Sequence, residues 1–211
     1  MATLVVDIET IGFDAENRDA LSPYKGRIIS VGMYDLERDL GSVYFVGNPT
    51  DKDFSDESFG YKSRTEKQLL EDFWESVSHY DVIVTYNGRS FDVPFLYLRS
   101  IALDVKPSVE IARQRYVTKQ SLPYHVDLFD EFSFHGNVNK KPSLSVLCEA
   151  LAIDNPKLLM SGEDVTEYFL NKQVMEIAKY NGKDVLAIRS LYAKWLTGLA
   201  PRSFINSIEM L

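Results

Sequence analysis

The pattern of apolar and polar positions divides the chain into a strand-rich first third and a helical last third. Short runs of apolar, β-branched residues over 4–8, 27–34 and 42–46 have the length and composition of strands. Leu40 and Gly41 predict a hairpin turn between the second and third runs. Residues 48–64 are polar and acidic and contain Pro and Gly, so this stretch is predicted to be a loop.

Helical spacing begins at residue 65. Apolar residues recur at intervals of three and four from Leu69 to Val77, and Thr65 can cap the helix that they predict over 65–79. The other predicted elements are strands over 81–85 and 125–128 and helices over 91–102, 144–153, 165–170 and 173–194, the last with a break or turn at Asn181-Gly182. Strands that alternate with helices and then give way to helices predict a mixed α/β fold.

Composition narrows the class of protein. The chain has 211 residues, 45% of them hydrophobic and 26% charged, which is typical of a globular protein and argues against disorder. We expect a single domain over residues 1–211, because this length suits one hydrophobic core and no stretch resembles a linker. Cys148 is the single cysteine, the N-terminus lacks a signal-peptide pattern, and no apolar run approaches the ~20 residues of a membrane span. We therefore expect a cytoplasmic protein with no membrane partner.

Acidic residues outnumber basic ones. The chain has 23 Lys and Arg against 31 Asp and Glu, a formal net charge of −8. This balance disfavours a protein that grips nucleic acid by overall basicity. The net charge is still compatible with a local site that binds a polyanion, provided that positive charge neutralises the acids at that site.

Two carboxylates interrupt the first apolar run. Because side chains alternate along a strand, Asp7 and Glu9 share one face and Val6 and Ile8 share the other. Neighbouring carboxylates repel each other and resist desolvation. Taken alone, the pair is explained equally well by an exposed face or by pairing with Lys or Arg.

Two more polar groups follow apolar elements. Asn87 ends a predicted strand and Asp92 begins a helix, a position where an acid also simply offsets the helix dipole. Tyr180 and Asp184 lie four residues apart and share a helix face that also carries apolar residues, where a plain Tyr-Asp hydrogen bond would explain them. Each group has an ordinary structural explanation when it is considered alone.

Together these groups collect four acids at the polar ends of apolar elements, without matching cations: Asp7, Glu9, Asp92 and Asp184. Divalent metal stabilises such a cluster, and an oxygen-only ligand set favours Mg²⁺ or Mn²⁺ over zinc. Two such ions about 4 Å apart activate water and stabilise the leaving oxygen in phosphoryl transfer. His79, His125 and His135 have no zinc-ligand spacing, so no zinc site is predicted.

The order and spacing of these residues resemble the motifs of the DEDD superfamily of 3′–5′ exonucleases. Residues 7–10 (DIET) resemble its first motif, D-x-E, and residues 87–92 (NGRSFD) resemble its second, N-x(2–3)-F/Y-D. Residues 180–184 (YNGKD) resemble the third motif in its tyrosine form, Y-x(3)-D, whereas the histidine form would need His in place of Lys179. The resemblance implies a ribonuclease-H-like fold, with a mixed sheet flanked by helices.

Two weaker stretches are similar to the proofreading domains of family-B DNA polymerases. They are residues 125–128 (HVDL) and residues 141–153, which resemble the serine-leucine helix that follows the second motif. Nothing that resembles a polymerase domain follows the third motif. The resemblance is therefore to a free-standing exonuclease of this type.

The resemblance implies a role for each acid. Asp7 would bridge two divalent metal ions, Glu9 and Asp184 would complete the site of the first ion, and Asp92 would hold the second. Tyr180 would hydrogen-bond and orient the attacking water, because a phenol with a pKa near 10 is poorly suited to act as a base at neutral pH.

The resemblance also implies the substrate contacts. Thr10 and Ile11 would meet the 3′-terminal nucleotide, and Asn87 and Phe91 would contact the sugar and a base. Aromatic stacking tolerates any base sequence, which suits a degradative enzyme. The predicted function is removal of 5′-mononucleotides from a nucleic acid 3′ end, with DNA favoured over RNA and a polymerase or repair protein as a candidate partner.

Two alternatives stay open. One is a catalytically silent nucleic-acid-binding or adaptor module on the same fold, and the other, ranked low, is a two-carboxylate glycosidase. Basic residues could track backbone phosphates or simply be solvated: Arg113, Arg115, Lys119, Lys140 and Lys141. Two divalent ions would cancel the charge of the four acids, so the net charge predicts weak binding without metal, a grip local to the 3′ end and low processivity.

Overall fold

A mixed sheet forms the centre of the computed structural model, which describes residues 1–14, 19–47, 51–111, 114–155 and 164–209. Within these residues the sheet has seven strands in the order β4-β5-β3-β2-β1-β6-β7. They are β1 (Thr3–Gly12), β2 (Gly26–Asp35), β3 (Leu40–Val46), β4 (Phe54–Ser55), β5 (Phe59–Arg64), β6 (Val82–Thr85) and β7 (Tyr124–Asp127). β2 pairs antiparallel with β1 and β3, while β6 is parallel to β1 and to β7. The predicted mixed α/β fold is confirmed.

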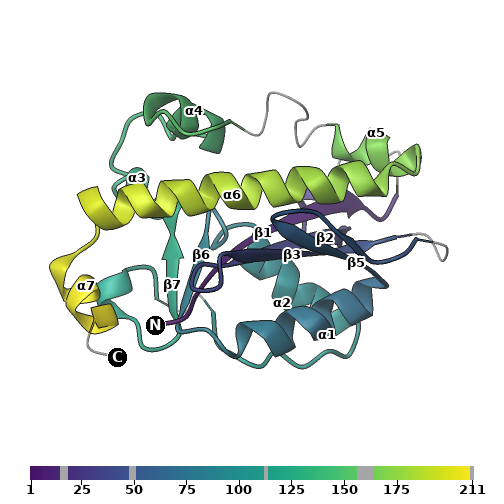
Figure 1. The fold of residues 1–211 in the computed structure, drawn as a ribbon, viewed down its shortest axis with the longest axis horizontal. Helices are drawn as coiled ribbons and strands as arrows, with labels where there is room; N and C mark the ends of the chain where they lie inside the picture. The colour runs from purple at the N-terminus through teal and green to yellow at the C-terminus, as the bar shows by residue number, and fades with distance from the viewer. Residues whose placement is uncertain (15–18, 48–50, 112–113, 156–163, 210–211) are drawn as a thin grey trace.

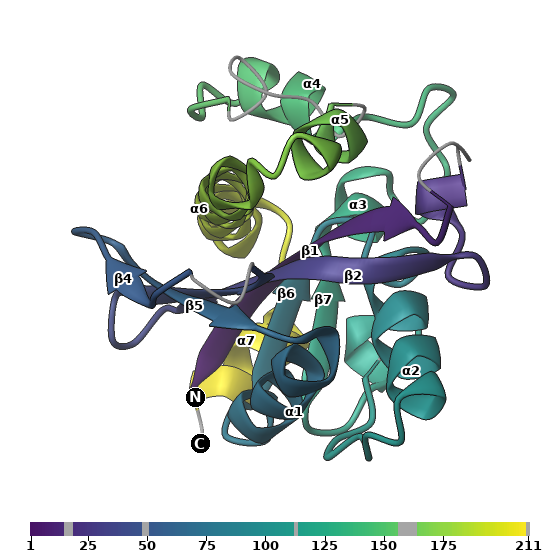
Figure 2. The same cartoon turned by 90° about the vertical axis from the view of Figure 1, so that its right-hand side faces the viewer.

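Helices cover both faces of the sheet (Figures 1 and 2). The long helix α6 (Val174–Gly198) crosses one face, and α1 (Glu66–Val77) and α2 (Asp92–Ala102) cover the other. The shorter helices are α3 (Leu128–Phe132), α4 (Leu144–Ala150), α5 (Val165–Leu170) and α7 (Arg202–Glu209), with 3₁₀ turns η1 (Asp19–Leu21) and η2 (Val117–Lys119). None of the described helices combines the length and apolar character that crossing a bilayer requires.

The alternation of β1 divides the core between the two faces. Val5 packs in the cluster that contains Trp195 of α6, whereas Val6 and Ile8 pack in the cluster that contains Phe73 of α1. Odd-numbered residues of β1 therefore face α6. The predicted placement of Val6 and Ile8 on the face opposite the carboxylates of Asp7 and Glu9 is confirmed.

Helix α1 begins as its sequence predicts. The hydroxyl oxygen of Thr65 accepts a hydrogen bond from the Gln68 backbone N–H at 3.3 Å, and Gln68 Oε1 accepts one from the Thr65 N–H at 3.0 Å. This reciprocal pair is a capping box, which satisfies two N–H groups that the first helical turn leaves open.

The prediction of a loop over residues 48–64 is wrong for its second half, which forms β4 and β5. Phe59 and Tyr61 alternate with more exposed residues, and both are buried in the cluster under α6. The carboxylate of Asp56 accepts the backbone N–H groups of Ser58 and Phe59 and so closes the turn before β5. The polar residues of this stretch lie in this turn and at the more exposed positions of β5.

The predicted break at Asn181-Gly182 is also wrong, because α6 continues through both residues. The side chain of Asn181 is fully buried and bonds Ser30 and Asp7 across the sheet instead of competing for its own helix backbone. A Cβ built on Gly182 would lie 3.4 Å from the ring of Phe59, an ordinary van der Waals contact, so this position of α6 packs directly over β5. Tertiary contacts therefore outweigh the local preference of these residues for a turn.

Candidate metal centre

Three carboxylates from two elements converge between the sheet and α6. Asp7 and Glu9 come from the α6 face of β1, and Asp184 comes from the sheet-facing side of α6. Each offers one carboxylate oxygen, and these oxygens all lie within 4.8 Å of one another. The side chains of Glu9 and Asp184 belong to residues only 9% and 6% exposed. The alternation of the strand and the four-residue spacing of the helix bring these acids together.

The electrostatics of this cluster favour a bound cation. Burial raises the pKa of Asp7 well above its usual range, and the charges of Asp92, Asp184 and Glu9 raise that pKa further. A divalent cation would relieve both effects, since it offsets desolvation and mutual repulsion together. The donor set consists of oxygens alone, which fits Mg²⁺ or Mn²⁺.

The side-chain amide of Asn181, at a position that the third motif leaves unspecified, holds Asp7 in place. Asn181 Nδ2 donates to Asp7 Oδ2 at 2.7 Å, and Asn181 Oδ1 accepts from the Ser30 hydroxyl at 2.9 Å. Gly32 lies opposite Asp7 in the β1–β2 pair, and a Cβ on it would stand 2.9 Å from Asn181 Oδ1. In the sequence, Asn181 is a polar residue on an otherwise apolar helix face, which indicates a buried partner. The prediction of a turn at Asn181-Gly182 led away from this interpretation.

Asp92 lies next to this group but outside it. It opens α2 as predicted and is 2% exposed, and its Oδ1 accepts the backbone N–H of Ile8 at 3.2 Å. Burial and the charge of Asp127 raise the pKa of Asp92 to about 8, against the lowering effect of its backbone hydrogen bonds. The charge of Asp92 acts on Asp7, so the fourth acid borders the three that converge.

Tyr180 shares the inner face of α6 with Asp184, and the two side chains are hydrogen-bonded. Burial raises the pKa of Tyr180 above its usual value of 10, and the charges of Asp184 and Glu9 raise it further. The phenol therefore stays protonated at neutral pH, which makes it a hydrogen-bond donor rather than a base.

The predicted substrate-binding residues have different surroundings. Ile11 is buried on the same face and packs in one cluster with Tyr180. The hydroxyl of Thr10 donates to the Ala20 carbonyl at 2.6 Å, on the face of β1 opposite the acids. Phe91 precedes α2 and packs edge-on against Phe95, with ring centres 5.1 Å apart.

The loop after β6 is held by an acid of β7. Asn87 adopts a left-handed backbone with φ of 62°, and its N–H donates to Asp127 Oδ1 at 2.9 Å. Asp127 Oδ2 accepts the N–H of Arg89, whose side chain pairs with Asp130 at 3.0 Å. A Cβ on Gly88 would stand 2.3 Å from the Thr85 hydroxyl, so only glycine fits this turn. Asp127, in the stretch that resembles the family-B domains, thus shapes the loop that carries Asn87.

The basic residues considered in the sequence have mixed surroundings. Arg115 pairs with Asp130 at 2.6 Å, and Lys119 lies over the Tyr116 ring at 5.9 Å. Lys141 lies 5.8 Å from the centre of the Phe129 ring. Arg113 lies outside the described residues.

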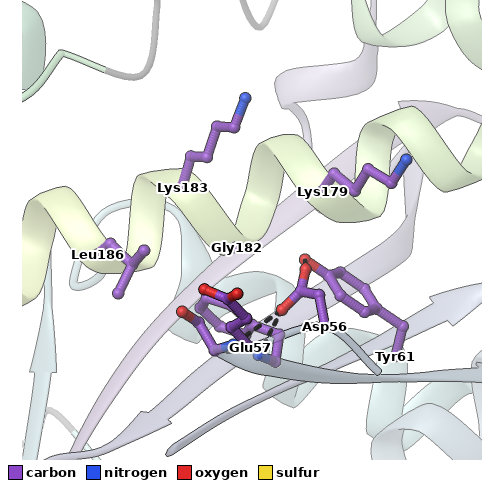
Figure 3. Close-up of a pocket in the computed structure, with 9 residues that line it drawn as sticks. Asp56, Glu57, Tyr61, Lys179, Gly182, Lys183 and Leu186 are labelled. Atoms are coloured by element: carbon purple, nitrogen blue, oxygen red, sulfur yellow. Dashed lines mark hydrogen bonds between the residues drawn. The ribbon is translucent and has the colours of Figure 1, made fainter. Parts of the chain in front are cut away.

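A separate hollow lies between α6 and the turn that joins β4 to β5 (Figure 3). It has a volume of about 360 Å³, and α6 and the turn between β4 and β5 line it with Lys179, Lys183, Asp56 and Glu57 among other residues. The predicted site residues do not line this hollow. The acidic turn therefore packs beside the third motif in space, although the two are distant in sequence.

Comparison with known proteins identifies the family. Residues 36–200 match a family described as predicted 3′–5′ exonucleases related to the exonuclease domain of PolB. The chain is 26% identical over 225 aligned positions to DNA polymerase 1 of Sulfolobus acidocaldarius, covering 92% of this chain and 25% of that protein. It is 29% identical to DNA polymerase 1 of Saccharolobus solfataricus over 41% of this chain and 11% of that protein. The chain thus spans a quarter or less of these relatives.

A solved structure has the same fold. The family B DNA polymerase of the archaeon Pyrobaculum calidifontis superimposes on 93% of this chain with a TM-score of 0.66, 22% sequence identity and 24% of its own length covered. The expected ribonuclease-H-like fold is confirmed by this match and by the mixed, helix-flanked sheet. The chain belongs to the family of 3′–5′ exonucleases related to the exonuclease domain of family-B DNA polymerases.

Proposed function

We propose that the protein is an active, metal-dependent 3′–5′ exonuclease that hydrolyses phosphodiester bonds and releases 5′-mononucleotides. The convergence of Asp7, Glu9 and Asp184, with Asp92 and Tyr180 beside them, is the observation that carries the proposal. Membership of an exonuclease family supports the reaction class. A silent binding module, which is the second candidate, would not need to keep four acids.

Four acids would hold the divalent ions. Asp7 converges with Glu9 and Asp184 and also interacts with the charge of Asp92, which suits a bridging role for Asp7. Mg²⁺ or Mn²⁺ ions bound there would neutralise the acids and stabilise the charge that develops when water attacks the phosphodiester. The protein contributes a fixed ligand geometry, because β1 and α6 hold the acids on rigid elements.

The remaining residues would orient the reactants. The phenol of Tyr180, whose O–H is bonded to Asp184, can accept a hydrogen bond from the attacking water and so orient it at the edge of the acid cluster. Ile11 and the backbone of Thr10 would contact the terminal nucleotide, and Asn87 and Phe91 would contact its sugar and a base. Stacking on Phe91 would be indifferent to base sequence.

Single-stranded DNA is the favoured substrate, with RNA as the alternative, and residues 1–211 would act as one domain. The net charge of −8 implies a grip limited to the 3′ end. A polymerase or repair protein that supplies a basic surface would raise processivity, which fits a role in proofreading or repair.

The test is shortening of 5′-labelled single-stranded DNA and RNA of matched sequence in Mg²⁺ or Mn²⁺. Stepwise shortening is expected for the wild type, and it should vanish in EDTA and in Asp7→Ala. Glu71→Ala, which removes an exposed acid of α1 on the opposite face of the sheet, is the matched control and should retain activity. A wild type that binds Mn²⁺ but shortens neither strand would overturn the proposal, and a wild type that gives no heat with Mn²⁺ would favour the silent module.

A further inference from the structure

Arg27 places a positive charge on the face of the sheet that carries the acids. It lies on β2 directly opposite Ile11 of β1. Opposed residues of an antiparallel pair share a face, and Ile11 packs in one cluster with Ile29 and Tyr180. Asp7, Glu9 and Ile11 are alternate residues of β1 and share one face of the sheet. Arg27, which is paired with Ile11, therefore lies on the face that carries the acids.

Helix α5 fixes the guanidinium of Arg27 from above. Its central carbon lies 5.5 Å from the centre of the Phe169 ring, a cation–π contact. α5 lies on the α6 side of the sheet, over the end of β1 (Figure 2). Arg27 is thus held at the rim of the acid cluster, about 6.6 Å along β1 beyond Glu9 at ~3.3 Å per strand residue.

The described residues provide no hydrogen-bond acceptor for Arg27 Nε. The other partly buried arginines that the structure describes pair with acids: Arg64 with Asp72, Arg89 with Asp130, Arg99 with Glu66 and Arg189 with Asp39. Arg27 Nε is buried and has no hydrogen-bond partner among the described residues. A buried donor without an acceptor is unfavourable, so the position calls for an acceptor from outside the described chain.

We propose that Arg27 binds a phosphate group of the nucleic acid strand whose 3′ end lies at the acid cluster. The inference rests on the proposed function. A planar guanidinium matches the geometry of phosphate oxygens, and the aromatic ring of Phe169 holds it in one orientation. The phosphate is either a linkage within the strand or a terminal 3′-phosphate. Arg27 would offset the repulsion that the acids exert on a polyanion before the strand is seated.

The test measures binding apart from catalysis. In the catalytically disabled background Asp7→Asn, with EDTA and low ionic strength, the dissociation constant of a labelled single-stranded oligonucleotide is measured by anisotropy as a function of NaCl. Arg27→Gln should weaken binding severalfold and reduce the slope of log K against log salt by about 0.7, the value for one phosphate contact on a single strand. Arg27→Lys should retain most of the slope.

The matched control is Arg202→Gln, which removes one charge from an exposed arginine of α7, at the opposite end of the molecule from α5 (Figure 1). It should leave the slope unchanged. Oligonucleotides that end in a 3′-hydroxyl or in a 3′-phosphate distinguish an internal from a terminal phosphate contact. If Arg27 binds a terminal phosphate, Arg27→Gln reduces the slope only for the strand that ends in a 3′-phosphate. Equal slopes for Arg27→Gln and Arg202→Gln with an unchanged thermal midpoint, or a parent that binds no oligonucleotide, would overturn the inference alone, whereas a wild type that shortens neither strand in Mn²⁺ would overturn the proposed function with it.

Discussion

Asn181 Nδ2 donates a 2.7 Å hydrogen bond to Asp7 Oδ2 and thereby ties α6 to the centre of β1. The Ser30 hydroxyl donates to the other end of the same amide, so the amide is held in one orientation. Burial and neighbouring charge raise the pKa of Asp7. Its carboxylate is therefore held by a neutral amide in a place where its charge is unfavourable until a cation binds.

Removing this amide should weaken metal binding. Asn181→Ala takes away the donor that orients Asp7, and loss of such an outer hydrogen bond commonly lowers metal affinity by about 10- to 100-fold. Ser30→Ala should give a smaller loss, because it frees only the orientation of the amide. Calorimetric titration with Mn²⁺ measures both variants. Wild-type affinity in Asn181→Ala, with the fold intact by circular dichroism, would contradict a positioning role.

Asp7→Asn should stabilise the metal-free protein. The folded-state pKa of Asp7 lies above that of the unfolded chain, so its charge destabilises the fold at pH 7 and less so as the pH falls through the folded pKa. The neutral amide should therefore raise the free energy of unfolding of the metal-free protein at pH 7. Urea unfolding in EDTA at pH 7 checks this. The same variant should lose the stabilisation that Mn²⁺ gives to the wild type, and a destabilised Asp7→Asn would refute the electrostatic argument.

Gly32→Ala should loosen the contact between β2 and α6. A Cβ at position 32 would stand 2.7 Å from Val185 Cγ2 and 2.9 Å from Asn181 Oδ1. Overpacking of this kind typically destabilises by about 1–3 kcal/mol, and here it also displaces the amide that holds Asp7. Gly60→Ala on β5 is the control, because its Cβ would meet nothing within 4 Å. Thermal unfolding of both variants should separate them, and equal midpoints would count against the tight packing.

His125 should make the fold sensitive to acid. Burial, with a smaller effect of the Arg89 charge, lowers the pKa of His125 from 6.5 to about 3. Between these values the unfolded chain binds one more proton than the folded chain, so stability falls as the pH drops below 6.5. His125→Gln should reduce the slope of unfolding free energy against pH by up to about 1.4 kcal/mol per pH unit in this window. Parallel curves for wild type and variant between pH 6 and 4 would rule out a buried neutral imidazole.

Local periodicity was enough to predict much of the acid cluster. Alternation along a strand placed Asp7 and Glu9 on one face, and four-residue spacing placed Tyr180 and Asp184 on one side of a helix. These relationships depend on backbone geometry that each element has by itself. For this reason they hold in the folded protein, together with the start of α1 at Thr65.

Relationships between elements could not be predicted in this way. Asn181 looked like part of a turn because its partners, Ser30 and Asp7, lie far away in the sequence. Strand β5 was missed because only its pairing with β3 and the cover of α6 reveal that Phe59 faces a core. The place of Arg27 opposite Ile11 depends on a register shift between Glu9 and Thr10, which no local pattern specifies.

The unbroken course of α6 explains which insertions the chain can tolerate. Each added residue turns a helix by about 100°, so a single insertion between Tyr180 and Asp184 would rotate the acid away from β1. The same holds for the strand, because one residue inserted between Asp7 and Glu9 would move Glu9 to the opposite face of the sheet. Loops between Asp92 and Tyr180 can lengthen without altering these spacings, whereas β7 and α5 must keep their places, since Asp127 shapes the Asn87 loop and Phe169 contacts Arg27. Spacing is therefore rigid inside each motif and adjustable between motifs.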